Sequence, residues 1–115
     1  MTAMDSSLFL SQIALVTTTV GSAADANRLA QGAVHATLAA CAQVEAITSH
    51  YVWDGQLEHS SEWRIVFKTQ PDAVQALWTW LKAQHPYDVP QLLLRTEHAE
   101  PSYAAWVADN VNLEK

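Results

Sequence analysis

The fold is decided by the segment from Val44 to Thr69, which reads VEAITSHYVWDGQLEHSSEWRIVFKT. Two runs typical of β-strands are joined there by Asp54-Gly55, a pair that favours a tight turn with positive φ. In the second run, bulky apolar residues recur at every other position, which indicates a strand with one face more hydrophobic than the other. The segment predicts a long antiparallel hairpin. Such a hairpin would project beyond its own sheet and leave edges for a partner to cover.

Upstream of the hairpin, the pattern predicts a strand and then a helix. Residues Ile13–Thr18 are apolar or β-branched and indicate a buried strand. Ser22, followed three residues later by Asp25, is typical of a helix N-cap. Apolar residues then recur at helical spacing between Ala26 and Leu38. We expect residues 1–10, ahead of the strand, to be flexible.

Downstream of the hairpin, the pattern predicts a helix, a strand and a last short helix. The second helix has Pro71 in its first turn and ends at His85-Pro86, because a residue before proline avoids helical geometry. Gln91–Arg95 reads as a fourth strand, and Pro101 opens the last helix. The order β-α-β-β-α-β with an extra C-terminal helix predicts one α+β, ferredoxin-like domain over residues 1–115.

Composition and charge narrow the class of protein. Half of the 115 residues are hydrophobic and five are Trp, so burial between subunits is one way to cover them. The net charge is −6 without any Lys/Arg cluster, which argues against nucleic-acid and membrane partners. A single Cys fits a reducing compartment. With neither a signal-peptide pattern nor an apolar run near the ~20 residues of a membrane helix, we expect a cytoplasmic protein.

The most distinctive stretch is His85-Pro86-Tyr87-Asp88-Val89-Pro90. Two prolines stiffen this connection and would hold an imidazole, a phenol and a carboxylate in a fixed arrangement. His85 is a candidate metal donor, since a neutral imidazole is a common ligand. The alternative is structural: His85 caps the end of the preceding helix, and Tyr87 packs.

Other side chains could also bind a metal ion or a ligand, and each of them has a purely structural alternative. Cys41 is a possible soft-metal donor or reactive thiol, but free Cys often only packs. His50 and His59 flank the turn and could bind Zn or Cu if they share a face, or they could lie singly on a solvated rim. Tyr51 and Trp53 lie two residues apart, hence on one face, and such aromatics are common in cores and interfaces.

Signatures of enzymes are absent from the sequence. It has no Gly-rich phosphate loop, no G-x-S-x-G elbow and no HExxH motif, so we expect no enzymatic activity. His85 near Asp88 is the acid–base pair that an enzyme could use. Glu62 and Lys68 share a strand face and could line a pocket, or form surface ion pairs of little energetic weight.

Taken together, several stretches resemble the CutA divalent-cation-tolerance family. Their order and spacing match over roughly residues 13–110. The matching stretches are Leu38-Ala39-Ala40-Cys41, Tyr51-x-Trp53-x-Gly55, Ser61-Glu62 with Lys68-Thr69, His85-Pro86-Tyr87-Asp88-Val89-Pro90, and Tyr103 with Trp106.

The resemblance implies a homotrimer in which the hairpin pairs with strands of neighbouring subunits. It also implies a role in divalent-metal tolerance, with Cu(II) or another divalent cation as the candidate cofactor. Thr18 and Gln84 stand where copper-binding relatives can carry Cys and His. Glu45-Ala46 replaces a Pro-Gly bulge and is about one residue shorter. The architecture is similar to that of PII-like signalling trimers, so a trimer acting through protein partners is the alternative function.

These observations predict a trimeric binding protein whose inter-subunit clefts take a metal ion or a small ligand. We expect His85 to be the metal donor, with Cys41 as a second one. The expected cleft residues are Tyr51, Trp53, Glu62, Lys68, Tyr87, Asp88 and Trp106.

Overall fold

The computed structural model describes residues 11–112, and eight elements follow one another along them. Their order confirms the β-α-β-β-α-β pattern with a final helix. The predicted flexibility of residues 1–10 lies outside the described residues. The elements are β1 (Gln12–Val20), α2 (Ala23–His35), β2 (Cys41–Trp53), β3 (Gln56–Thr69), the short 3-10 helix η1 (Pro71–Ala73), α3 (Val74–Gln84), β4 (Leu93–His98) and α4 (Pro101–Asp109).

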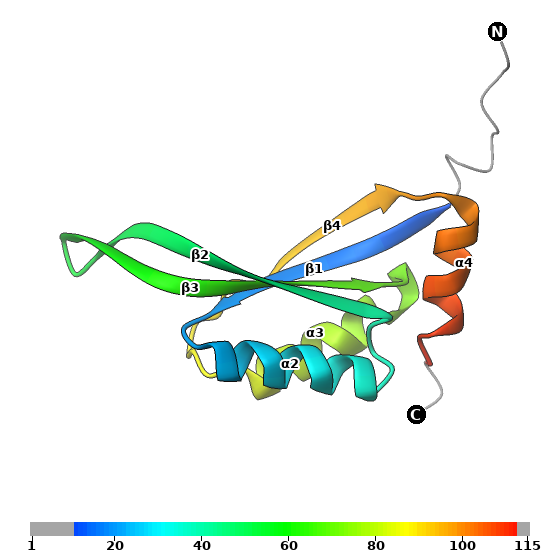
Figure 1. Ribbon diagram of the computed structural model, residues 1–115, viewed down its shortest axis with the longest axis horizontal. Coiled ribbons are helices and arrows are strands. Elements are labelled where there is room, and N and C mark those ends of the chain that lie inside the picture. Colours follow the sequence, from blue (N-terminus) through cyan, green and yellow to red (C-terminus); the bar gives the residue numbers. More distant parts are fainter. Residues whose placement is uncertain (1–10, 113–115) are drawn as a thin grey trace, which may run out of the picture.

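The four strands form one antiparallel sheet in the order β2-β3-β1-β4. Figure 1 shows α2 and α3 side by side on one face of this sheet, while α4 stands at the end of the sheet away from the hairpin. The predicted ferredoxin-like arrangement is therefore correct. Within residues 11–112, no helix combines the length and the apolar character needed to cross a membrane.

Several strand boundaries differ from the sequence expectation, since β1 spans Gln12–Val20 and β4 ends at His98. β2 begins at Cys41, which pairs with Lys68, so the hairpin is longer than the segment from Val44 indicated. β4 begins at Leu93 and not at Gln91. The reason lies in the backbone of Gln91, whose carbonyl accepts a hydrogen bond from the Thr18 hydroxyl at 2.6 Å and stands outside the ladder with β1.

The hairpin follows the predicted tight turn. Asp54 has φ 51° and Gly55 has φ 74°, the positive values that this kind of turn requires. Pairing runs without a bulge from Cys41 opposite Lys68 to Trp53 opposite Gln56, so the shorter segment at Glu45-Ala46 simply stays in register. The far part of the hairpin extends well beyond the helices (Figure 1).

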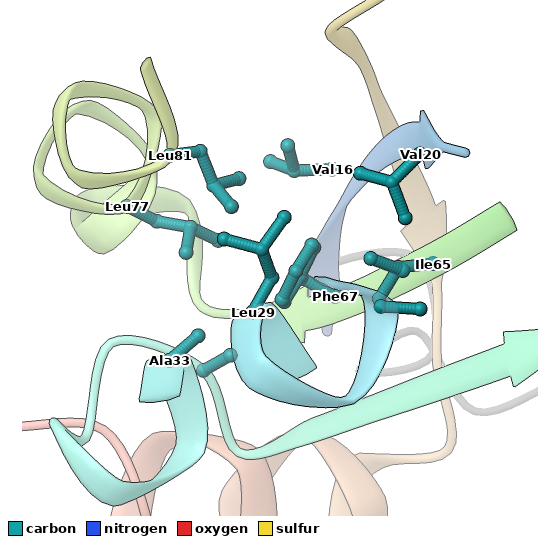
Figure 2. Close-up of a cluster of buried hydrophobic side chains, with 10 residues drawn as sticks. Val16, Val20, Leu29, Ala33, Ile65, Phe67, Leu77 and Leu81 are labelled. Atoms are coloured by element: carbon teal, nitrogen blue, oxygen red, sulfur yellow. The ribbon is translucent and has the colours of Figure 1, made fainter. Parts of the chain in front are cut away.

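The main core fills the space between the sheet and the two helices on its face. Phe67 and Ile65 of β3 are fully buried and pack with Leu29 of α2 and with Leu77 and Leu81 of α3 (Figure 2). Burying such side chains is the dominant favourable term in folding, at roughly 25 cal/mol per Å² of apolar surface.

A smaller core lies under α4, on the opposite face of β1. Ile13 and Leu15 of β1 pack with Val107 of α4 and with Val111. Their neighbour in the sequence, Val16, belongs to the main core. Since neighbouring side chains of a strand point to opposite faces, β1 contributes to both cores. The final helix is thus a structural part of the domain.

Several apolar side chains of the hairpin and of β4 are not covered in the single chain. Leu57 is 81% exposed, Trp53 71%, Val52 69% and Leu93 57%. Large exposed apolar side chains gathered on edge strands are typical of surfaces that meet a partner.

Candidate functional site

A groove of about 780 Å³ opens where the hairpin meets the loop after α3. It brings together five of the seven predicted cleft residues. β2 contributes side chains that share a face with those of β3, because Tyr51 pairs with Glu58 across the strands. The loop after α3 closes the other side. The lining residues are Tyr51, Trp53, Glu58, Ser60, Glu62, Tyr87, Asp88 and Val89.

The groove combines negative charge with aromatic surface. Three carboxylates line it, from Glu58, Glu62 and Asp88, and none of its lining residues is Lys, Arg or His. The rings of Tyr51, Trp53 and Tyr87 supply faces that attract cations. This lining favours a small positively charged ligand over an anion.

Tyr87 ties the loop to the hairpin. Its hydroxyl donates a hydrogen bond of 3.1 Å to the Glu62 carboxylate. Burial raises the pKa of the Tyr87 phenol above its ordinary value of 10.0, and the Glu62 carboxylate raises it further. The phenol therefore keeps its proton near neutral pH and remains the donor to Glu62.

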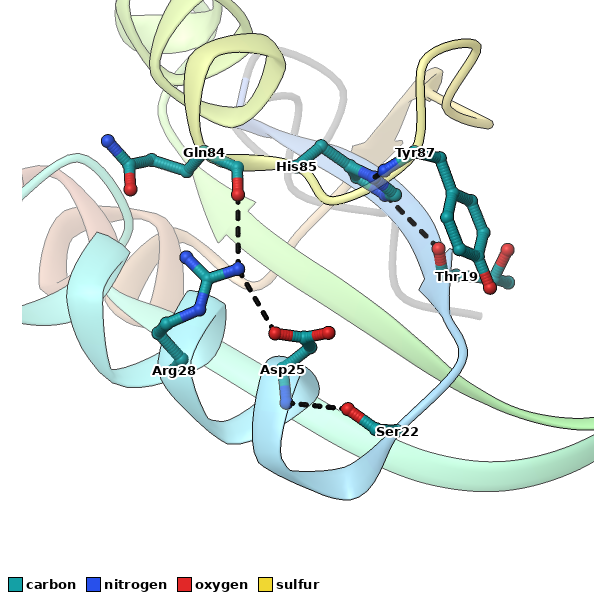
Figure 3. A network of polar contacts seen from close by, with 7 residues as sticks. All are labelled: Thr19, Ser22, Asp25, Arg28, Gln84, His85 and Tyr87. Atoms are coloured by element: carbon teal, nitrogen blue, oxygen red, sulfur yellow. Dashed lines mark hydrogen bonds and ion pairs between the residues drawn. The ribbon is translucent and has the colours of Figure 1, made fainter.

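His85 holds the same loop to β1 from inside the protein. His85 is only 9% exposed, and its Nε2 lies 2.9 Å from Thr18 Oγ1. The same nitrogen lies 3.1 Å from the Thr19 carbonyl oxygen (Figure 3). Because the Thr18 hydroxyl donates its own proton to the Gln91 carbonyl, Nε2 must be the donor to both threonines. Nδ1 then accepts the backbone N–H of Tyr87 at 3.1 Å.

This network favours a neutral imidazole. Burial lowers the pKa of His85 below its ordinary value of 6.5, and the Thr19 carbonyl opposes that shift. The positive charge of Arg28 lowers the pKa further, while Asp25 raises it. His85 thus acts as a fixed, neutral link between α3, β1 and the backbone of Tyr87.

Arg28 of α2 joins the two helices near this link. Its guanidinium donates to the Gln84 carbonyl at 3.1 Å, at the end of α3, and to Asp25 at 3.3 Å (Figure 3). Basic side chains at a helix end satisfy carbonyls that have no intrahelical partner. Ser22 caps α2 as predicted, accepting the Asp25 N–H at 3.1 Å.

Comparison with known proteins identifies the family. Residues 14–110 match the family described as CutA1 divalent ion tolerance protein. The chain belongs to the CutA family. A CutA homolog of Xenopus laevis is 40% identical over 88 residues, which are 75% of this chain and 58% of that protein. A divalent-cation tolerance protein CutA of Pectobacterium atrosepticum is 40% identical over 84 residues, which are 71% of this chain and 76% of that protein.

The fold agrees with solved CutA structures. CutA from Synechococcus elongatus superimposes with a TM-score of 0.85 at 36% identity, covering 89% of this chain and 92% of its own. A structure described as CutA from the same organism complexed with a Bis-Tris molecule gives a TM-score of 0.81 at 35% identity, covering 88% and 95% of the two chains.

The predicted metal donors, His85 and Cys41, do not form a ready metal site here. Both ring nitrogens of His85 are engaged by protein groups. The neighbouring donor is the hydroxyl of Thr18, a weaker partner for a soft metal than a thiolate. Cys41 lies elsewhere, opposite Lys68 in the hairpin. Within residues 11–112, no three or more His, Cys, Asp or Glu side chains gather so as to hold a metal ion.

The metal roles of His85 and Cys41 therefore stay predictions. For His85 to bind a metal ion, its imidazole would have to leave the threonines of β1 or release the N–H of Tyr87. In the geometry observed, the imidazole contacts Thr18, Thr19 and Tyr87. The end of α3 is met by the backbone N–H of His85, which donates to the Leu81 carbonyl.

Two predicted cleft residues of this CutA chain lie outside the groove. Lys68 Nζ stands 5.6 Å from the ring centroid of Tyr103, and Tyr103 stacks on Trp106 with a centroid distance of 5.7 Å. Lys68 follows Glu62 by six residues, which is about 20 Å along a strand. In the single chain Lys68 of β3 thus lies over an aromatic pair of α4, away from the groove.

Three groove residues were not among those predicted. Glu58 and Ser60 precede Glu62 by four and two residues, so they occupy the same face of β3. The two-residue period of the strand was the signal that could have included them. Val89, in contrast, enters the groove only because the loop after α3 folds back on the hairpin, which no local pattern indicates.

Gly21 offers a test of the Tyr87–Glu62 link. A Cβ at this position would lie 2.9 Å from the Tyr87 hydroxyl oxygen, so Gly21→Ala should displace the phenol from Glu62. We expect the pKa of Tyr87 to fall toward its ordinary value, which an NMR titration of the tyrosine ring signals would measure, with Tyr87→Phe for assignment. Gly32→Ala is the matched control, because its Cβ meets the Trp80 ring instead. An unchanged Tyr87 titration in Gly21→Ala would show that the link does not depend on this close approach.

Proposed function

We propose that this CutA-family chain is a non-enzymatic, cytoplasmic homotrimer in divalent-cation tolerance, and that its groove binds a small positively charged ligand. The observation that carries the ligand class is the lining of the groove. Three carboxylates and three aromatic rings converge there without a basic side chain among the lining residues. Carboxylates attract a cation by charge, and aromatic faces add an attraction of about 0.5–2 kcal/mol for a partly desolvated cation.

The trimer is supported by the surface that a single chain leaves uncovered. Val52 and Leu57 stand directly opposite each other near the tip of the hairpin, and both are mostly exposed. Leu93 and Leu94 are half-exposed or more on the edge strand β4. Pairing of the projecting hairpin with strands of neighbouring subunits would cover these side chains and remove open sheet edges.

A trimer would also complete the groove. Its wall at Trp53 belongs to the part of the hairpin that extends beyond the helices, and Trp53 is 71% exposed. A neighbouring subunit docked on the hairpin would narrow the opening and strengthen electrostatic attraction by excluding water. The Bis-Tris complex of the Synechococcus elongatus relative supports the idea that a CutA protein can hold a small organic molecule.

The experiment uses native mass spectrometry and calorimetry, with Bis-Tris as the probe at a pH below the pKa of its amine, where the molecule is positively charged, in a buffer free of other amines. We expect a mass of about three times the 12.7 kDa chain and saturable binding of Bis-Tris. Trp53→Ala and Glu62→Gln should each weaken binding roughly 3- to 30-fold, the range that the loss of one cation–π or charge contact implies.

Asp109→Asn is the matched control for charge. Asp109 is an exposed carboxylate at the end of α4 and does not line the groove. Its removal should leave the affinity for Bis-Tris unchanged. If wild-type trimers bind no Bis-Tris, or if Asp109→Asn weakens binding as much as Glu62→Gln, the groove is not the site of a cationic ligand.

A second candidate function is a trimer that acts through protein partners without binding a specific ion. The exposed apolar side chains at the hairpin tip favour it, because Trp53 and Leu57 form the kind of surface that proteins bury on association. This candidate predicts a stable trimer whose groove variants bind a defined protein partner as wild type does. The Bis-Tris titration therefore separates the two candidates.

A further inference from the structure

The face of the hairpin opposite the groove carries two histidines side by side. His50 of β2 pairs directly with His59 of β3, so their side chains leave the ribbon on the same face. Their ring centroids are 5.8 Å apart and the ring planes are tilted by 32°. Both residues are exposed in the single chain. On this face they form the next cross-strand pair, further from the turn, after Val52 and Leu57, the side chains that a neighbouring subunit would cover.

This spacing suits two imidazoles that share one metal ion. A ring nitrogen binds zinc at about 2.0–2.1 Å, which puts each ring centroid about 3 Å from the ion. Two rings bound to one ion then have centroids about 4.5–5.5 Å apart for N–metal–N angles of about 90–120°. The observed 5.8 Å is slightly longer, so a rotation of the two exposed side chains, without movement of the strands, would bring both rings onto one ion.

The surroundings leave the pair available for a metal. The flanking pairs on the ribbon are Thr48 with Ser61 and Val52 with Leu57, and none of these four side chains is charged. The carboxylates of Glu58 and Glu62 belong to the other face, in the groove. The ligand set is therefore two neutral nitrogens, with water completing the coordination, and this set favours Cu(II) among common divalent ions.

We propose that His50 and His59 chelate one divalent transition-metal ion, with Cu(II) bound most tightly, on the hairpin face opposite the groove. The site is distinct from His85 and Cys41 and does not depend on a ligand in the groove. It rests on the direct cross-strand pairing of the two imidazoles and on their ring separation.

The test is a Cu(II) titration of the full chain by calorimetry, with electron paramagnetic resonance of the bound ion. Wild type should bind one Cu(II) per chain through this pair with nitrogen ligands in the spectrum. His50→Gln and His59→Gln should each lower the affinity roughly tenfold or more, because the second imidazole no longer binds as an intramolecular partner. The double variant should lose the nitrogen signature of this site.

His35→Gln is the matched control, because His35 is exposed in the last turn of α2 and lies outside the hairpin. It should leave Cu(II) affinity unchanged.

Two results would overturn the proposal: unchanged Cu(II) affinity in His50→Gln and His59→Gln, or loss of Cu(II) only in His85→Ala or Cys41→Ser. The groove variants Trp53→Ala and Glu62→Gln leave both hairpin histidines in place. Failure of Bis-Tris to bind in the groove would therefore not alter the Cu(II) result. Conversely, a chain that binds Bis-Tris but shows no histidine-dependent Cu(II) would contradict only the metal site.

Discussion

Phe67→Ala is expected to lower the free energy of unfolding by about 3–5 kcal/mol, the cost of removing a large ring from a packed core. Phe67 is fully buried and is the largest of the fully buried side chains in residues 11–112. It lies on β3 among Leu29, Leu77 and Leu81, so the two helices could close the resulting cavity only by shifting together (Figure 2). Urea denaturation at a fixed protein concentration would measure the loss, since an oligomer's stability depends on concentration.

Phe67→Leu provides the graded comparison. It keeps an apolar side chain and leaves a smaller cavity, so we expect a smaller loss at an unchanged slope of free energy against urea. If Phe67→Ala costs less than about 1 kcal/mol, the packing between the sheet and the helices is not the main source of stability.

Acidification is expected to destabilise the protein through His85. The folded protein holds this imidazole neutral, and burial lowers its pKa below the value of 6.5 that applies in the unfolded chain. Above pH 6.5 the side chain is neutral in both states and its contribution to stability is complete. As the pH falls, the unfolded chain binds a proton first, so stability is lost until the pH passes below the folded-state pKa.

Protonation also disturbs a specific contact. His85 Nδ1 accepts the N–H of Tyr87, and a protonated ring has no lone pair left for it. The loop that carries Tyr87 should therefore loosen from β1 at low pH. Urea denaturation from about pH 7.5 to about pH 5 would show a steeper loss in wild type than in His85→Gln.

His35→Gln is the control for this pH series, since His35 is exposed and should leave the slope as in wild type. Where His85→Gln folds too poorly for comparison, an NMR titration of the His85 ring in wild type provides a second measurement. A ring that titrates at or above 6.5 in the folded protein would contradict the expected direction.

Local patterns were enough to predict the elements and the hairpin. Asp54-Gly55 required positive φ, the alternation on β3 separated the two faces, and Ser22 indicated the start of α2. The start of β4 could not be predicted, because it depends on a hydrogen bond between Thr18 and the distant Gln91 backbone. Contacts across that many residues have no signature in a window of local sequence.

The site was predicted in part for the same reason. Tyr87 and Glu62 were both expected in a cleft, yet the bond between them joins a loop to a strand. The role of His85 depends on the hydrogen-bond partners of its ring nitrogens. Two of these partners, Thr18 and Thr19, belong to β1, far away in the sequence. Residue type alone leaves a metal donor and a structural histidine equally open.

Because the register of the hairpin is unbroken, neighbouring residues of each strand lie on opposite faces, and the two faces carry different kinds of side chain. Acidic and aromatic side chains occupy one side of the ribbon, and His50 with His59 occupies the other. Because a strand repeats every two residues, inserting or deleting one residue in either strand would turn its outer part over. Evolution can thus lengthen this arm in steps of two residues while keeping its faces distinct, whereas steps of one would mix them.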